Sequence, residues 1–362
     1  MYSLLITILA IIWMLGILIF FHELGHLLVA KLVRVKVLKF SLGFGPKLIG
    51  TKIGETEYQI SAIPLGGYVK PLGENPREKV RKQEKARAFI HQSVPKRMAI
   101  TLAGPLTNFL LAVFIFTLVF IVGIPIPLNT PVIGKVRNGF PALEAGVKPG
   151  DLIVRVDKIQ INQWADLPSV IRKSEGKEVQ LTIKRGEETV KIKVTPRTII
   201  EKNAVSGQEE KTYQIGIEPS WVIKRESVYK SIGIGFSQTW SITKQIIVFI
   251  VKIIGGEEKV FKNLGGPITI ARIAGQQAQE GLLNLVFFTA FISINLAILN
   301  LFPIPVLDGG HFFFLILEAI RRKPLSVRQM ELLQQIGLII IILLMVFALY
   351  ADIMRILPQG AK

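Results

Sequence analysis

The sequence predicts a polytopic α-helical membrane protein with four transmembrane helices and an inserted α/β domain. Half of the 362 residues are hydrophobic, only 19% are charged, and the mean hydropathy is +0.46. A soluble domain carries about 25% charged residues. This apolar content excludes an intrinsically disordered chain. The chain contains no cysteine, which excludes a disulfide scaffold and a zinc site built on thiolates.

Four charge-poor stretches are each long enough to cross a bilayer, which takes about 20 helical residues. They are 1–30, 98–123, 282–317 and 332–350. The first stretch has neither a basic leading segment nor a small-residue cleavage site, so we do not expect it to be a signal peptide. A fifth apolar stretch, 232–254, contains two lysines. We expect it to be an amphipathic helix in the membrane interface; the alternative is a fifth span.

Basic residues predict how the spans are oriented. Segment 31–97 holds 15 Lys and Arg residues against five Glu, and the link 321–328 after the third span holds four more basic residues. By the positive-inside rule both should be cytoplasmic, which leaves the two termini and segment 125–281 outside. Contact with anionic membrane lipid then explains the net charge of +18, and no nucleic acid is expected as a partner.

The pattern changes to short β-type runs between the second and third spans. These runs are 132–136, 152–156, 179–183 and 189–194. The last two alternate hydrophobic and polar residues, so we expect a hairpin, and we expect a short helix at 168–173. Residues 141–153 (PALEAGVKPGDLI) resemble the signature of a PDZ domain, in which Gly146 and Gly150 supply turn conformations. A PDZ domain binds an extended peptide or a protein C-terminus at a sheet edge; the alternative is a β-domain that only spaces two helices.

An HExxH motif lies near the end of the first span. On a helix His22 and His26 share one face and can hold a single Zn²⁺, while Glu23 can act as general base toward a metal-bound water. The alternative is two ordinary histidines and a surface glutamate. However, an unpaired charged residue in an apolar helix costs about 2.5 kcal/mol or more to insert. The position of the motif therefore favours a metal site.

A third ligand is expected from the third span, because catalytic zinc uses three protein ligands and an open position. Asp308 is the only acid in that span. Spans one and three run in the same direction, so Asp308 and His26 should both lie in the cytoplasmic half of the bilayer. Pro303 and Pro305 should shorten or unwind the span beside Asp308. His311 is the alternative ligand.

Two asparagines, Asn295 and Asn300, add amide groups to the same region. Unwound backbone is tolerated within a bilayer only where protein or water covers it, and a hydrolase needs such a water-lined cavity. Asn300 either binds the backbone of a substrate or satisfies the carbonyl groups that Pro303 leaves free.

These motifs together resemble the site-2 proteases, a family of intramembrane zinc metalloproteases, and within it the bacterial regulator-of-sigma-E protease branch. The resemblance covers nearly the whole chain. Besides the HELGH motif, the LDG motif and the PDZ-like insertion, it includes GFGP at 43–46, PLGGY at 64–68, AGPLTN at 103–108 and GGPI at 265–268. Several members of this branch carry two tandem PDZ domains, whereas this chain has room for one.

The resemblance implies a zinc-dependent endopeptidase that hydrolyses peptide bonds in or near the transmembrane segments of single-span proteins, such as membrane-bound anti-sigma factors or remnant signal peptides. The implied zinc ligands are His22, His26 and Asp308, with Glu23 as general base. The implied substrate-binding residues are Asn300, Pro305, Gly43, Phe44 and Gly45. The last three belong to an expected membrane-associated, reentrant β-hairpin at 40–69.

Four parts are expected along the chain: a membrane part at 1–127, the PDZ-like domain at 128–219, an interfacial segment at 220–281 and a second membrane part at 282–362. The expected location is a bacterial cytoplasmic (inner) membrane, with the active site in its cytoplasmic half. The alternative function is a non-catalytic, membrane-anchored PDZ scaffold with structural zinc. Structural sites usually close with four protein ligands, and the three found here favour catalysis.

Overall fold

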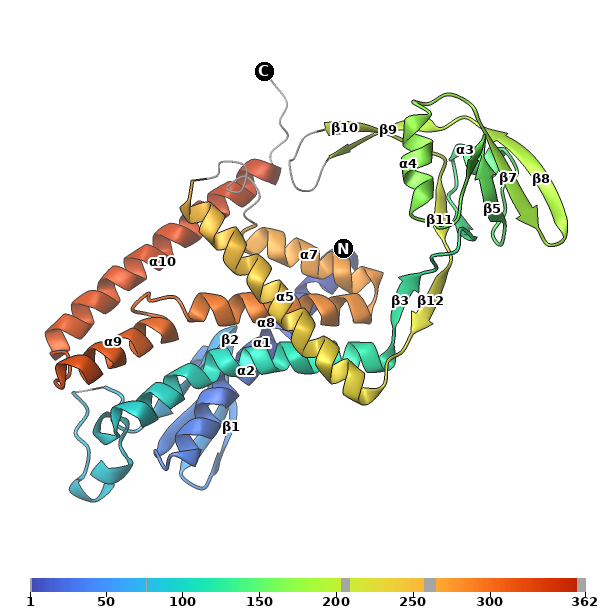
Figure 1. Cartoon of the computed structure of the whole chain (residues 1–362). Coiled ribbons are helices and arrows are strands. Elements are labelled where there is room, and N and C mark those ends of the chain that lie inside the picture. The colour runs from blue at the N-terminus through green and yellow to red at the C-terminus, as the bar shows by residue number, and fades with distance from the viewer. Residues whose placement is uncertain (1, 76, 203–208, 257–264, 357–362) are drawn as a thin grey trace. The chain divides into compact units, whose positions relative to one another are not determined.

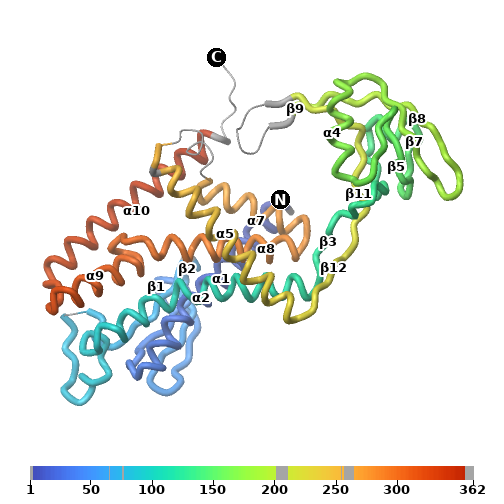
Figure 2. The backbone as a smooth tube through the Cα atoms, in the orientation of Figure 1, coloured from blue at the N-terminus to red at the C-terminus, as the bar shows by residue number. Residues whose placement is uncertain are grey.

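The computed structural model describes residues 2–75, 77–202, 209–256 and 265–356. The chain forms two compact units (Figures 1 and 2). One unit consists of residues 1–119 and 227–362, and the other of residues 120–226. The first unit carries the long helices and the second is rich in β-strands.

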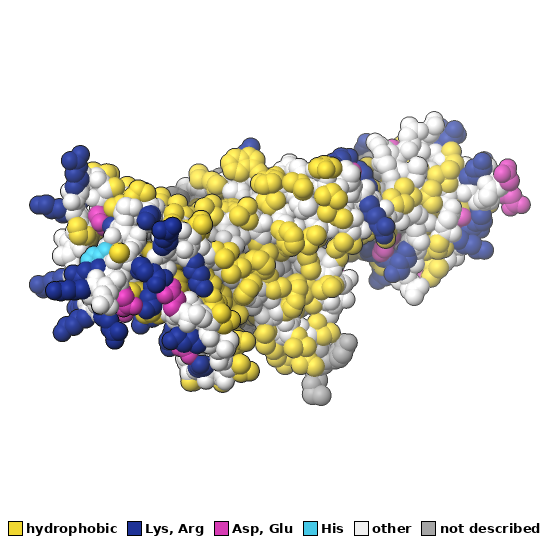
Figure 3. Space-filling view, turned by 90° about the horizontal axis from the view of Figure 1, so that it is seen from below, with side chains coloured by type: hydrophobic (Ala, Val, Ile, Leu, Met, Phe, Trp, Pro, Cys, Tyr) yellow, Lys and Arg dark blue, Asp and Glu magenta, His cyan; other side chains and the backbone are white. Residues whose placement is uncertain are grey.

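Four helices in the described part of the chain are long and apolar enough to cross a membrane. They are α1 (Tyr2–Leu32), α2 (Val94–Val122), α8 (Leu282–Asn300) and α10 (Val327–Ile356). Many of their large hydrophobic side chains are exposed, and Figure 3 shows a broad apolar surface that carries few Lys and Arg side chains. Such a surface suits contact with lipid. The prediction of four apolar spans is confirmed at the level of helix length and composition.

The third predicted span is not one continuous helix. Helix α8 ends at Asn300 and α9 (Asp308–Arg321) begins at Asp308, so residues 301–307 form a link between them. The link contains Pro303 and Pro305, which lack the N–H that a helix needs, so the expected unwinding is confirmed. The helix of spanning length therefore ends at Asn300, before residue 317. A Cβ at Gly310 would lie 2.2 Å from the carbonyl oxygen of Ile304, so glycine lets the link fold back onto the start of α9.

Two further helices pack on this unit. Helix α5 (Val228–Ile254) confirms the helix expected at 232–254, and it lies close to α2, because a Cβ at Gly235 would be 2.6 Å from Thr117 Oγ1. Helix α7 (Pro267–Glu280), which the sequence analysis did not separate, is held at its N-terminus by α10. There the Asp352 carboxylate accepts hydrogen bonds from the backbone N–H groups of Gly266 and Ile268, both at 2.9 Å.

Strands β1 (Val37–Ile53) and β2 (Thr56–Pro71) pair in antiparallel orientation. Association of the hairpin expected at 40–69 with the membrane stays a prediction. The strands bend so that the first half of β1 pairs on both sides. Ser41 is opposite Gln59 on one side and Tyr68 on the other. Segment 67–71 therefore forms one edge of this arrangement. Two short 3₁₀ helices, η1 (Lys82–Arg87) and η2 (Phe89–His91), connect the hairpin to α2.

The second unit is built on a four-stranded antiparallel sheet in the order β6-β5-β7-β8. Three two-stranded pairs accompany it: β3 with β12, β4 with β11, and β9 with β10. The strand bounds are β3 (Ile124–Pro127), β4 (Ile133–Val136), β5 (Leu152–Val156), β6 (Ile159–Gln160), β7 (Val179–Arg185), β8 (Glu188–Val194), β9 (Arg197–Lys202), β10 (Glu209–Gln214), β11 (Ile217–Pro219) and β12 (Trp221–Lys224). Two helices, α3 (Pro141–Glu144) and α4 (Asp166–Lys173), complete the unit.

The core of this unit follows from strand alternation. Ile153, Leu181 and Ile183 are fully buried and pack in one cluster with Leu167 and Ile171 of α4. The predicted hairpin is confirmed by the pairing of β7 with β8. All four predicted β-type runs and the predicted short helix are present, with bounds shifted by at most two residues.

Candidate metal centre

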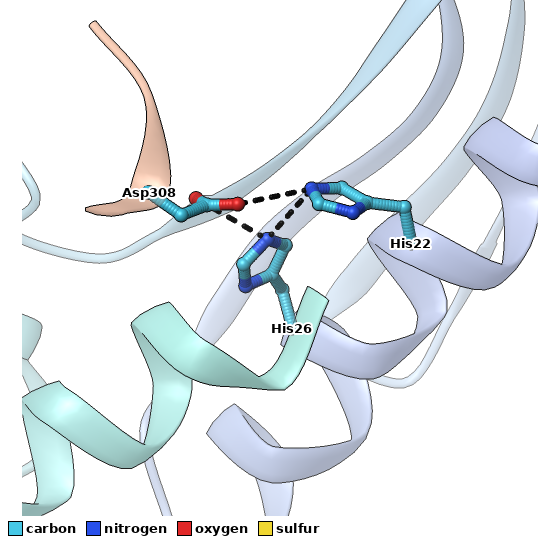
Figure 4. Close-up of side chains that lie close together, drawn as sticks. All are labelled: His22, His26 and Asp308. Carbon is cyan, nitrogen blue, oxygen red and sulfur yellow. Dashed lines mark hydrogen bonds and ion pairs between the residues drawn. The ribbon is translucent and has the colours of Figure 1, made fainter. Parts of the chain in front are cut away.

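Three side chains from distant parts of the sequence meet within the helical unit. His22 and His26 project from α1 toward Asp308, the first residue of α9 (Figure 4). His22 Nε2 lies 3.1 Å from Asp308 Oδ2, His26 Nε2 lies 3.5 Å from Asp308 Oδ1, and the two Nε2 atoms are 3.3 Å apart. The side chains are only 11%, 14% and 20% exposed.

The donor set fits a zinc ion of the catalytic kind. Two imidazole nitrogens and one carboxylate oxygen all lie within 4.8 Å of one another, and among the described residues this cluster contains three ligands rather than four. Two histidines with one carboxylate are a common protein set for catalytic zinc, which keeps the fourth position for water or substrate. His311, the alternative ligand, is not a member of the cluster.

Helix α2 packs tightly against α1 at the level of the histidines. A Cβ at Gly104 would lie 2.3 Å from His26 Nε2 and 2.7 Å from His22 Nε2. A Cβ at Gly25 would lie 2.3 Å from Thr107 Oγ1 on α2. The absence of side chains at both positions therefore lets the helices approach and leaves room beside the imidazoles.

Both imidazoles have a second partner on α2. The Nδ1–H of His26 donates to the carbonyl oxygen of Ile100 at 2.8 Å. Because a carbonyl oxygen only accepts, this bond leaves the Nε2 lone pair of His26 free to bind a metal. His22 Nδ1 lies 3.3 Å from Nδ2 of Asn108.

Glu23 lies next to His22 on α1 and is covered by the edge segment of the hairpin. The backbone N–H of Val69 lies near its carboxylate. A Cβ at Gly67 would lie 2.9 Å from Glu23 Cγ, so the backbone of segment 67–71 runs directly over this side chain. The candidate general base and the sheet edge are therefore neighbours.

The predicted substrate residues occupy two places. Asn300 is the last residue of α8, and its Nδ2 lies 3.5 Å from His22 Nε2. Pro305 lies in the link before Asp308 and contacts Gly337 of α10. In the hairpin, Phe44 lies parallel to the ring of Tyr68 at 6.3 Å. The residues flanking Phe44, Gly43 and Gly45, have φ values of 93° and 85°. Asn295 does not contribute its amide to the site, because it donates to the carbonyl of Phe291 in its own helix.

Sequence reasoning did not identify Gly104 or Asn108 as site residues, although both lie in the quoted AGPLTN motif. It also missed a clamp between α2 and α9. Arg97 Nη1 donates to Glu318 Oε2 at 3.0 Å and Nη2 donates to Oε1 at 2.5 Å, with the two side chains 10% and 16% exposed. This bidentate pair connects the helix that begins with Asp308 to the helix that supports the histidines.

A His-His-Asp cluster among helices of membrane-spanning length defines a membrane-embedded metallohydrolase as the class of protein. The model of peptidase family M50 matches residues 10–344. The chain therefore belongs to peptidase family M50, the site-2 protease family. The predicted resemblance and the predicted enzyme class, a zinc-dependent membrane protease, are confirmed.

Curated relatives match over almost their full length. The chain is 34% identical to a protein of Clostridium acetobutylicum named as a zinc metalloprotease, with 93% of this chain and 94% of the relative covered. It is 31% identical to the regulator of sigma-E protease RseP of Salmonella typhimurium, with 98% and 100% covered. That alignment runs over 458 positions, more than the 362 residues of this chain, so RseP carries additional residues. The PDZ domain of an SdrC-like protein from Listeria monocytogenes aligns with 26% of this chain and 93% of its own length, at 21% identity and a TM-score of 0.21.

Proposed function

We propose that this protein is an intramembrane endopeptidase in which His22, His26 and Asp308 hold the catalytic zinc and Glu23 is the general base. The observation that carries this proposal is the meeting of the three ligand atoms, from α1 and from a helix start almost 300 residues later, within 4.8 Å of one another. When bound, zinc activates a water molecule and polarises the carbonyl group of the scissile peptide.

The protein side chains supply the proton transfers. The Glu23 carboxylate takes a proton from the attacking water and returns it to the nitrogen of the leaving amine. The backbone of segment 67–71, which lies against Glu23, orients this carboxylate. The Asn300 amide, next to His22, hydrogen-bonds the substrate backbone, and Pro305 keeps the link beside Asp308 unwound. No covalent bond between enzyme and substrate is needed.

The substrate is a transmembrane segment of a single-span protein, such as an anti-sigma factor or a remnant signal peptide. Its helical carbonyl groups are already hydrogen-bonded, so the segment must unwind before attack. Segment 67–71 replaces the lost hydrogen bonds by pairing with the extended substrate. Its contact with Glu23 supports this role, and Gly43, Phe44 and Gly45 extend the same surface within a membrane-associated hairpin.

The protein acts in the cytoplasmic membrane of a bacterium. The basic residues of segment 31–97 support an orientation with that segment and the metal centre on the cytoplasmic side, against anionic lipid, and with both termini and the PDZ-like domain outside. The proposed parts are 1–127, 128–219, 220–281 and 282–362. The PDZ-like domain, over 128–219, receives peptide segments of substrates or of other proteins at a sheet edge.

The substitution Glu23→Gln tests the assignment. Purified variant and wild type are compared for zinc content and for cleavage of a single-span substrate in detergent. We expect the variant to retain one zinc per chain and to lose about 10²- to 10⁴-fold in rate, because only the proton acceptor is removed. Wild-type turnover by the zinc-loaded variant would contradict the role of Glu23. Cleavage by the wild type that persists after zinc is chelated would contradict the metal mechanism.

A further inference from the structure

Asn108 is a buried polar residue whose side chain is only half satisfied. Its relative exposure is 0%, and it lies on the face of α2 that meets α1. Among the described residues its Oδ1 has no hydrogen-bond partner, and its Nδ2 has one, His22 Nδ1 at 3.3 Å. Its backbone carbonyl accepts a hydrogen bond from Ser293, which any residue at this position would keep. A buried amide with an unpaired atom lowers the stability of a fold, so packing alone does not explain an asparagine here.

Metal binding by His22 requires a particular proton position. The Nε2 atom of His22 faces Asp308 and His26. A neutral imidazole that binds a metal through Nε2 carries its proton on Nδ1, and that proton needs an acceptor. Oxygen and nitrogen of a carboxamide occupy nearly equivalent positions, so the amide turned by half a rotation presents Oδ1 to His22.

The spacing along α2 supports this orientation. Ile100, Gly104 and Asn108 recur every four residues and therefore share one face of the helix. The carbonyl of Ile100 accepts from Nδ1–H of His26, and Gly104 lies against both imidazoles. Asn108 is thus the partner of His22 Nδ1, and Ile100 is the partner of His26 Nδ1. Residues on one face of α2 therefore contact both histidines.

We propose that Asn108 is a positioning residue for the metal centre: its side-chain oxygen accepts the Nδ1–H of His22 and fixes the Nε2 lone pair toward the metal. The inference rests on the proposed metal site and deepens it. It assigns to α2 the outer shell of both histidine ligands, one through a backbone carbonyl and one through a side chain.

Two substitutions of the same branched shape separate positioning from packing. Asn108→Leu keeps the branched shape and removes the acceptor, whereas Asn108→Asp keeps an acceptor oxygen in either orientation. Zinc affinity of the purified full-length proteins is measured by competition with a chelator, and thermal unfolding is measured on the metal-free proteins. We expect zinc affinity to fall about 10- to 100-fold in the leucine variant and to stay within a few-fold of wild type in the aspartate variant. The metal-free leucine variant should unfold at or above the wild-type temperature.

The outcomes are distinct. A leucine variant that binds zinc as tightly as wild type would overturn the inference. So would equal losses of zinc affinity in both variants together with lower unfolding temperatures, because that result would mean a packing role. A wild-type protein that binds no zinc would instead overturn the proposed function itself.

Discussion

Adding one methyl group at Gly104 should disable the metal centre. In Gly104→Ala the new Cβ would lie 2.3 Å from His26 Nε2 and 2.7 Å from both Nε2 and Cε1 of His22. In protein structures a Cβ atom essentially never lies within 3.0 Å of a non-bonded heavy atom from another part of the chain. Either the imidazoles turn away or the two helices separate by several tenths of an ångström, and zinc–nitrogen bonds of about 2.0–2.1 Å do not tolerate such a change.

The expected size of the effect follows from overpacking. Extra methyl groups in a well-packed interior destabilise it by about 1–3 kcal/mol. If the zinc-bound state is destabilised by this amount, zinc affinity falls about 5- to 150-fold. Zinc affinity is measured by chelator competition, and cleavage of a single-span substrate is measured on the same preparations. Both should fall together.

Gly16→Ala is the matched control. Gly16 lies on α1 with nothing within 4 Å of an added Cβ, so this variant should bind zinc normally, and alanine should favour the helix by about 1 kcal/mol relative to glycine. If Gly104→Ala bound zinc and cleaved substrate like wild type, the close approach of α2 to the histidines would be wrong.

Local patterns were sufficient to predict the candidate spans and the three candidate ligands of the metal centre. Apolar stretches of about 20 residues predict spanning helices without knowledge of their neighbours, and the spacing of His22 and His26 places them on one helix face. Asp308 was found because it is the only acid in an otherwise apolar stretch. Alternation of hydrophobic and polar residues likewise predicted the hairpin of β7 and β8.

Packing between distant segments was not predictable in the same way. The roles of Gly104 and Asn108 exist only because α2 lies against α1, about 80 residues away in sequence. Periodicity describes which face of a helix is apolar, but it does not say which helix covers that face. The end of α8 at Asn300 likewise depends on the fit of Gly310 against the link, in addition to the prolines.

Two further predictions test the parts that hold the site and the second unit. Replacing Arg97 by Met should destabilise the helical unit by about 3–5 kcal/mol, because the largely buried carboxylate of Glu318 loses its partner. Thermal unfolding in detergent measures this loss, and an unchanged unfolding temperature would show that the Arg97–Glu318 pair does not stabilise the unit. In the second unit, burial alone would raise the pKa of Asp151, but hydrogen bonds from Arg185 and from the Lys148 backbone lower that pKa below its ordinary value of 3.8. The folded state therefore binds this proton less readily than the unfolded state, so the stabilisation is complete above about pH 5. It is lost as the pH falls through the lowered pKa. Hydrogen bonds to a charged group contribute about 1.5–3 kcal/mol, so Asp151→Asn should have a lower unfolding temperature than wild type at pH 6. At pH 2 the difference in unfolding temperature between the two proteins should be smaller. A difference that stays constant between these two pH values would contradict the charged state of Asp151 as the source of the stabilisation.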